Sequence, residues 1–277
     1  MNVQTLALAD ATLTRVGYVD VAIPPEAAGL AANEFADIAW RSPLWTEGEQ
    51  LRAGAAAWFA DIAGTRLVFD PVQAADYALR ADRATEAAQQ TTVARLFADA
   101  GFPRESVDRV VMTHIEGVGM VAWRNEDGSW SPFFPNARVL VSEANLADFV
   151  AASPQPGDDM QAAAWQTLLE QGLVDTYSDG DEIIAGLAAQ VGGGHCPGHA
   201  MLHFNDAAGA TLATMLGHLA ISPIHLATGV CLPQHSDPAV AWSLLRAAAS
   251  DGRLLIGPLW PTPGCGRWVN GAFVAGD

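Results

Sequence analysis

The chain has 277 residues, of which half are hydrophobic and 16% are charged, so it is long enough to bury a large core. Its 31 acidic residues outnumber its 14 basic residues, all of them arginines, and give a net charge of −17. Such a charge repels phosphate backbones and anionic lipid headgroups, which argues against nucleic acids and membranes as partners and favours an uncharged small-molecule substrate.

Glycine and proline are scattered along the chain rather than gathered into a linker, which predicts one domain over residues 1–277. The N-terminus lacks the basic start and apolar core of a signal peptide, and no run of about 18 apolar residues suits a membrane span. Cysteine occurs at three widely spaced positions, 196, 231 and 265, which is typical of reduced thiols. We therefore expect a soluble, cytoplasmic protein; a homodimer is left open.

The first third of the chain is expected to form mainly strands. Leu6 to Val21 is rich in alternating apolar positions, and Ala55 to Ile62 with Thr65 to Phe69 are predicted to form a hairpin around an Ala-Gly turn. Helical spacing then follows between Thr85 and Ala100, and Val107 to Thr113 returns to strand character.

The remaining elements alternate between strands and helices. The pattern predicts a strand at Arg138 to Val141 and a helix that begins after an N-cap at Ser142. Further helices are expected over Asp158 to Gln171 and Pro238 to Ser250. Further strands are expected at Glu182 to Leu187, Ala200 to Phe204, Thr211 to Leu216 and Leu254 to Ile256. Two blocks of strands, each followed by helices, predict two sheets with helices packed outside them.

Four histidine- or glycine-rich stretches adjoin these strands, where functional sites are usually assembled. They are THIEGVG (113–119), GGGHCPGHAML (192–202), LGHLAISPIHL (216–226) and LIGPLWPTPGCGR (255–267). Their order and spacing resemble the metallo-β-lactamase superfamily. LVFDP (67–71) and FFPNARVLVSEANLADF (133–149) extend the resemblance towards its lactonase and organophosphate-hydrolase branch. The resemblance implies an α+β fold, an αββα sandwich with the site at one edge of two mixed sheets.

The metal-binding motif of that superfamily is kept only in part. Its first loop has the form His-x-His-x-Asp-His, and here His114 and Glu116 occupy the first two places while Val118 and Gly119 occupy the last two. The resemblance aligns His195 with the next histidine ligand. His218 replaces the aspartate that bridges two metals, and Leu259 replaces the final histidine.

These changes affect the two metal positions of the superfamily differently. The positions that would serve the first metal hold residues able to bind it, whereas those unique to the second hold none. The candidate ligands are His114, Glu116, His195 and His218. We expect at most one divalent ion, zinc ahead of iron or manganese, in a hydrolase of small ester-, lactone- or phosphotriester-like substrates.

The number of ligands decides the chemistry of such a site. Four protein ligands would fill a zinc tetrahedron and make the site structural, whereas three would leave a position open and His218 available as a general base. His218 and Glu116 are therefore the candidate catalytic residues. Two histidines with one carboxylate would also suit a non-haem iron oxygenase. A metal-free pocket that binds an apolar ligand or performs acid–base chemistry is the alternative.

The other histidines and the cysteines receive more ordinary interpretations. We expect a structural role for His199, a strand position for His203, and places at an entrance for His225 and His235. Cys196 and Cys265 are expected in loops near the pocket. Either could be a thiolate nucleophile, but packing as a small apolar residue is the favoured interpretation. Asp70 is expected to anchor backbone amides near the site.

Overall fold

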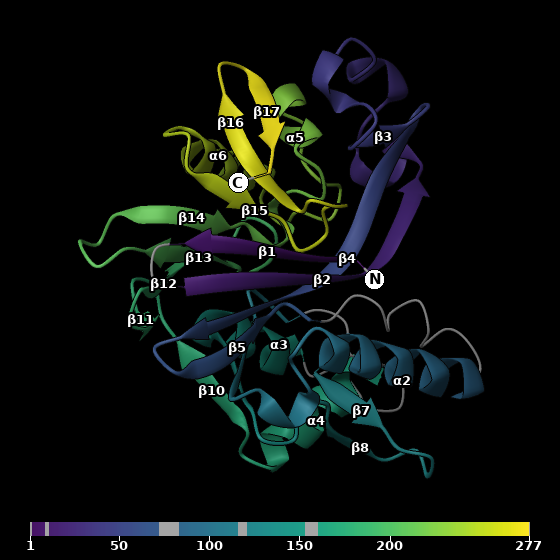
Figure 1. The fold of residues 1–277 in the computed structure, drawn as a ribbon, viewed down its shortest axis with the longest axis vertical. Coiled ribbons are helices and arrows are strands. Elements are labelled where there is room, and N and C mark those ends of the chain that lie inside the picture. Colours follow the sequence, from purple (N-terminus) through teal and green to yellow (C-terminus); the bar gives the residue numbers. More distant parts are fainter. Residues whose placement is uncertain (1, 9–10, 72–82, 116–120, 153–159, 277) are drawn as a thin grey trace.

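The computed structural model describes residues 2–8, 11–71, 83–115, 121–152 and 160–276, and Figure 1 shows their arrangement. Within these residues the strands form two large sheets and one separate hairpin. The hairpin joins β7 (Ala122–Arg124) to β8 (Trp130–Pro132). None of the helices in the described segments combines the length and apolar character that crossing a bilayer needs.

The first sheet has eight strands within the described residues, in the order β1-β2-β4-β5-β6-β9-β10, with β3 beside β4. Its first half is antiparallel, and β5, β6, β9 and β10 run parallel to one another. Parallel pairing brings the carboxyl ends of β5 and β6 to the same edge. The strands are β1 (Asn2–Leu8), β2 (Ala11–Ile23), β3 (Thr46–Glu47), β4 (Gln50–Ile62), β5 (Thr65–Phe69), β6 (Arg109–Val111), β9 (Arg138–Ser142) and β10 (Val174–Tyr177).

The second sheet has seven strands in the described part of the chain, in sequential order from β11 to β17. Neighbours are antiparallel except for β14 and β15. The strands are β11 (Glu182–Ile184), β12 (Leu187–Val191), β13 (Ala200–Asn205), β14 (Thr211–Met215), β15 (Leu254–Ile256), β16 (Cys265–Val269) and β17 (Ala272–Ala275).

The two sheets pack face to face through one hydrophobic core. Leu67 and Phe69 of β5 point into it from the first sheet, and Leu254 and Ile256 of β15 from the second. Because side chains alternate along a strand, the residues between them point outwards. Val68 faces the outer hydrophobic cluster of the first sheet. The residue between Leu254 and Ile256 on β15 likewise faces the outer hydrophobic cluster of the second sheet.

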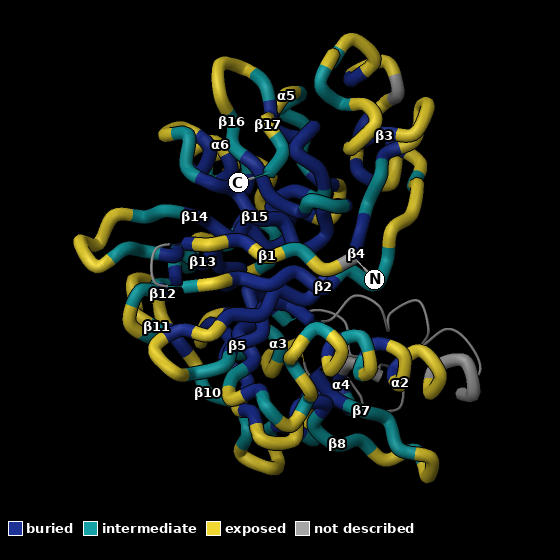
Figure 2. Tube along the Cα trace, viewed as in Figure 1, coloured by how far each residue is buried: buried dark blue, intermediate teal, exposed yellow. Residues whose placement is uncertain are grey.

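Helices cover the outer face of each sheet, and Figure 2 shows the buried strands between exposed outer surfaces. On the first sheet Phe97 and Trp165 lie in the outer cluster. On the second sheet Ala241 and Leu245 lie in the corresponding outer cluster. The predicted αββα sandwich is confirmed. The helices are α2 (Arg83–Asp99), α3 (Glu143–Ala152) and α4 (Met160–Glu170) on the first sheet, and α5 (Ile224–Thr228) and α6 (Pro238–Ala249) on the second.

Most predicted elements are present, and one needs correction. The segment Glu182 to Leu187, predicted as one strand, is divided between β11 and β12. Gly186, with φ of +84°, turns the chain between them, and its N–H donates to the Glu182 side chain. The predicted start of the helix at Asp158 lies outside the described residues.

Candidate functional site

Three histidines converge at one edge of the sandwich. His114 follows β6, His195 lies between β12 and β13, and His218 lies in a 3₁₀ turn, Gly217–Leu219, after β14. One ring nitrogen of each lies within 4.8 Å of those of the other two. The His114 ring centroid is 4.9 Å from that of His195 and 4.8 Å from that of His218. Three loops that are distant in sequence therefore present imidazoles to one point.

Asp70 holds the first of these loops. It follows β5 with φ of +41°, and its N–H donates to the carbonyl of Val111 on the neighbouring strand. Its carboxylate accepts from the backbone N–H of Thr113 at 2.7 Å and from the Thr113 hydroxyl at 2.8 Å. Burial raises the pKa of Asp70, and nearby His114 and these hydrogen bonds oppose that rise. The expectation that Asp70 anchors backbone amides agrees with this geometry.

The same contacts determine the tautomer of His114. The hydroxyl of Thr113 has one hydrogen and gives it to Asp70, so its oxygen accepts from Nδ1–H of His114, 3.0 Å away. The lone pair of the His114 ring is therefore on Nε2. A hydrogen bond to one ring nitrogen is the usual way in which proteins orient a histidine for metal binding.

His199 holds the loop that carries His218. Its Nε2 accepts from the backbone N–H of His218 at 3.1 Å. A Cβ on Gly217, where φ is +55°, would lie 2.4 Å from that Nε2 and 2.6 Å from Thr113 Oγ1. Burial, together with the neighbouring histidines, lowers the pKa of His199 well below its usual value. The predicted structural role of His199 is consistent with these contacts.

Asn145, on the first turn of α3, joins the first two loops. Its side-chain carbonyl accepts from the N–H of Ile115 at 2.6 Å, and its amide donates to the carbonyl of Pro197 at 2.7 Å. Ser142 accepts from Asn145 N–H, as expected of an N-cap, and donates to the carbonyl of Gly198. Asn145 was not identified from the sequence, because its two contacts exist only in the folded chain.

Of the other predicted metal-site positions, the structure describes only one. Glu116, Val118 and Gly119 lie outside the described residues. Leu259 is buried, and its carbonyl accepts from the N–H of Gly54 at 2.8 Å. Its side chain offers no ligand atom.

The two cysteines near the motifs differ in environment. Cys196 is partly exposed, with its sulfur 3.5 Å from the side-chain nitrogen of Asn145. Cys265 was placed in a loop near the pocket, and this is wrong: it begins β16, opposite Ile256, and is fully buried in the core between the sheets. Small apolar packing is therefore the role of Cys265.

His225 and His235 were expected at an entrance, and the structure corrects both. His225 is buried, and its Nδ1–H donates to the carbonyl of Val230 at 2.8 Å. His235 is also buried, its ring centroid lies 5.4 Å from that of His195, and its Nε2–H donates to the carbonyl of His218 at 3.2 Å. His203 faces outwards on β13, as expected, between Gln190 and Thr214.

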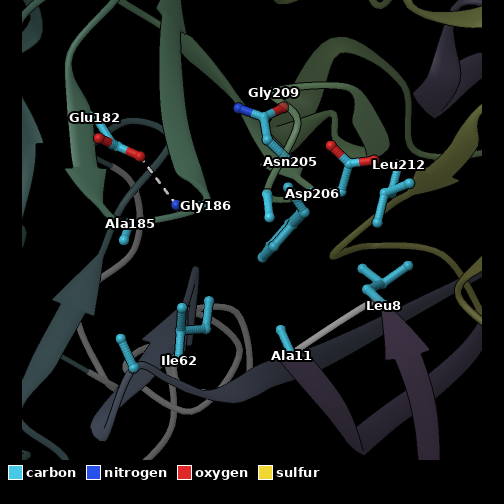
Figure 3. A pocket seen from close by; sticks show the side chains of 13 residues that line it. Leu8, Ala11, Ile62, Glu182, Ala185, Gly186, Asn205, Asp206, Gly209 and Leu212 are labelled. Atoms are coloured by element: carbon cyan, nitrogen blue, oxygen red, sulfur yellow. Dashed lines mark hydrogen bonds between the residues drawn. The ribbon is translucent and has the colours of Figure 1, made fainter.

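A cavity of about 480 Å³ lies at the end of β13 opposite to the histidines. Figure 3 shows the side chains that line it. Leu8, Ile62 and Phe204 form its apolar wall. The carboxylates at its rim already accept backbone hydrogen bonds: Glu182 from Gly186, and Asp206 from the turn that follows it. Among the described residues that line it, no donor set converges as the three histidines do.

Solved structures resemble this chain over nearly its whole length. A hydrolase of the β-lactamase superfamily, AbOPH, is 17% identical with a TM-score of 0.73, and the match covers 99% of this chain and 97% of that one. The dizinc quorum-quenching lactonase AidC, solved with a product, is 14% identical with a TM-score of 0.72 and the same coverage. A probable metal-dependent hydrolase from Staphylococcus aureus is 13% identical with a TM-score of 0.71, covering 98% and 99%.

No protein-family model matches the sequence, and no curated protein matches it either. At these identities the structural likeness establishes the fold. The chain has the metallo-β-lactamase fold of the lactonase-like and hydrolase-like structures, as the sequence motifs predicted.

Proposed function

We propose that this protein is a metal-dependent hydrolase that binds one divalent ion through His114, His195 and His218 and acts on a small uncharged ester, lactone or phosphotriester. The observation that carries the proposal is the convergence of three ring nitrogens within 4.8 Å. They lie in a fold shared with proteins named as a dizinc lactonase and a probable metal-dependent hydrolase.

The donor set suits the proposed ion. Three histidines are the protein ligands of one group of catalytic zinc sites, in which a fourth position stays open. Metal binding requires neutral imidazoles, and the hydrogen bond from Nδ1–H to Thr113 leaves the Nε2 lone pair of His114 for the ion. Zinc is favoured, and iron and manganese are the other candidates.

His218 is assigned here as a ligand rather than as a general base. Its ring nitrogen belongs to the converging group. Within the described residues that group contains imidazoles alone, so it differs from the two-histidine, one-carboxylate set of iron oxygenases. A neutral histidine in place of a bridging aspartate supplies no charge to hold a second cation, which supports a site with one metal.

A divalent ion in this site would polarise a carbonyl or phosphoryl oxygen and lower the pKa of water. The chain itself contributes orientation. Asp70 and Thr113 fix the ring of His114, and Asn145 fixes the loops of His114 and His195 relative to each other.

The charge of the chain favours an uncharged substrate. With −17 overall, the protein repels anions at a distance, whereas esters, lactones and phosphotriesters carry no charge to be repelled. A homoserine product is bound in one of the similar structures, which supports lactones as the first substrates to test.

Hydrolysis assays on these three classes, with and without added zinc, test the proposal. The His218→Ala variant should lose metal-dependent hydrolysis, and His203→Ala, which changes a histidine outside the group, should keep it. Hydrolysis that is unaffected by metal removal and by His218→Ala would reject the proposal. That result would favour the metal-free pocket with an apolar ligand or acid–base chemistry.

A further inference from the structure

We infer that His235 is a positioning residue that fixes His195 and His218 relative to each other; this inference rests on the metal site proposed above. His235 lies outside the four motifs, in the segment that leads into α6. It is 7% exposed and contacts both histidines. A single imidazole therefore connects two of the three proposed ligands.

The contact with His218 is through the main chain. His218 has φ of −92° and ψ of 20°, which interrupts the 3₁₀ turn around it. A buried backbone carbonyl in such a turn requires a donor, and Nε2–H of His235 supplies one at 3.2 Å. On the other side of the same residue, the N–H donates to His199. Two imidazoles thus hold the two backbone polar groups of His218, one as donor and one as acceptor.

The contact with His195 involves both ring and backbone. The rings of His235 and His195 meet edge to face, with an interplanar angle of 86°. Next to them, the N–H of Ser236 donates to the carbonyl of His195 at 2.9 Å, and the N–H of Asp237 donates to that of Gly194 at 2.9 Å. Residues 235–237 therefore run along the loop that presents His195.

Helix α6 makes this segment rigid. Asp237 is its N-cap, and the carboxylate accepts from the N–H groups of Ala239 and Val240. A Cβ on Gly194 would lie 2.7 Å from the backbone of Ala241, so the loop and the helix are in close contact. Helix α6 consequently fixes the position of His235. The hydrogen bond from His235 in turn fixes the backbone of His218.

Residues that orient metal ligands typically change metal affinity by about 10–100-fold when they are replaced. The direct contact here is one hydrogen bond from the Nε2 position. Glutamine extends its amide nitrogen to about the position of Nε2, whereas asparagine is one methylene shorter. His235→Gln should therefore keep the hydrogen bond, whereas His235→Asn keeps a polar side chain without it. Comparing the two variants measures the effect of the hydrogen bond alone.

The test is cobalt(II) titration of the wild type, His235→Gln, His235→Asn and His235→Leu, followed by visible absorption, with His203→Gln as a control outside the cluster. Asparagine and leucine should weaken cobalt binding about 10–100-fold and change the spectrum. Glutamine and the control should stay close to the wild type. Equal binding by all variants, or an equal loss with glutamine and asparagine in folded protein, would overturn the inference.

Backbone hydrogen exchange of the metal-free proteins separates this inference from the proposed function. Exchange across residues 216–219 should be faster in His235→Asn than in His235→Gln, and equal exchange would contradict the positioning role. A wild type that binds no cobalt would reject the proposed metal site, whatever the exchange result. If His235→Leu does not fold, the glutamine and asparagine variants alone decide the matter.

Discussion

The hydroxyl of Thr113 donates to the carboxylate of Asp70 across 2.8 Å, although 43 residues separate them in sequence. Parallel pairing of β5 with β6 brings the two together, because each lies just beyond the end of its strand. The same hydroxyl oxygen accepts from His114. A buried carboxylate thus orients the first proposed ligand through one intervening side chain.

Replacement of Thr113 by valine should weaken metal binding. Valine keeps the shape of threonine but removes both side-chain hydrogen bonds, so Asp70 and His114 each lose a partner. We expect zinc affinity to fall about 10–100-fold and the free energy of unfolding of the metal-free protein to fall by about 1–3 kcal/mol. Competition with a chromophoric chelator and urea unfolding measure the two effects.

Thr113→Ser is the matched control, since it keeps the hydroxyl and loses only a methyl group. It should retain most of the zinc affinity. If Thr113→Val and Thr113→Ser bind zinc equally well, the orientation of His114 does not depend on this hydroxyl.

Gly217 should tolerate no side chain. At φ of +55°, a Cβ would approach His199 and Thr113 within 2.4 Å and 2.6 Å. Backbone strain and overpacking together predict that Gly217→Ala lowers the free energy of unfolding by about 2–5 kcal/mol. Gly252, at φ of +70° with open space around it, is the control, and Gly252→Ala should cost about 1–2 kcal/mol. Equal costs in urea unfolding would mean that the loops at Gly217 can move apart.

Stability should fall in acid, in part through His225. Burial lowers the pKa of His225 to about 4 in the folded protein, whereas in the unfolded chain it is about 6.5. Between these values the unfolded state binds more protons, so stability is present above about pH 6.5 and is lost as the pH falls towards 4. The shift corresponds to about 3 kcal/mol.

The variant His225→Asn removes this titration and retains a donor towards Val230. Its free energy of unfolding should vary less than that of the wild type between pH 7 and pH 4.5, as measured by urea unfolding. Parallel pH profiles for the two proteins would show that His225 does not contribute.

Thiol reactivity should distinguish the three cysteines. Cys196 and Cys231 are partly exposed, whereas Cys265 is buried between the sheets. An aromatic disulfide reagent should therefore modify at most two thiols in the native protein and the third only after denaturation. Because no thiol is assigned to the chemistry, alkylation of the native protein should leave hydrolysis intact. Loss of hydrolysis on alkylation would contradict this expectation; if the Cys196→Ala variant treated in the same way kept its hydrolysis, the loss would come from a group attached to Cys196 that blocks the site.

The sequence predicts the layers of the fold better than its turns. Alternation of apolar residues identified the hairpin of β4 and β5, and helical spacing identified α2. The hairpin of β16 and β17 was missed, although Asn270 and Gly271, both with positive φ, form its turn. Alternation is weak there because both strands are short and β17 lies at the edge of the sheet.

The candidate site is predicted only as far as its motifs extend. His114, His195 and His218 were identified in aligned loops and converge in the structure. The ligand and catalytic roles proposed for Glu116 remain predictions, since that residue lies outside the described segments. His235 and Asn145 contact the site from outside the four histidine- or glycine-rich stretches, and their roles depend on long-range packing that no local pattern encodes.

The most direct test of the proposed site is the metal content of protein purified without chelator, measured by elemental analysis beside a His114→Ala, His195→Ala double variant. A site with one metal should give about one equivalent of zinc, iron or manganese per chain, absent from the double variant. Two equivalents would contradict the loss of the second metal. No bound metal, with none taken up on addition, would contradict the metal site itself.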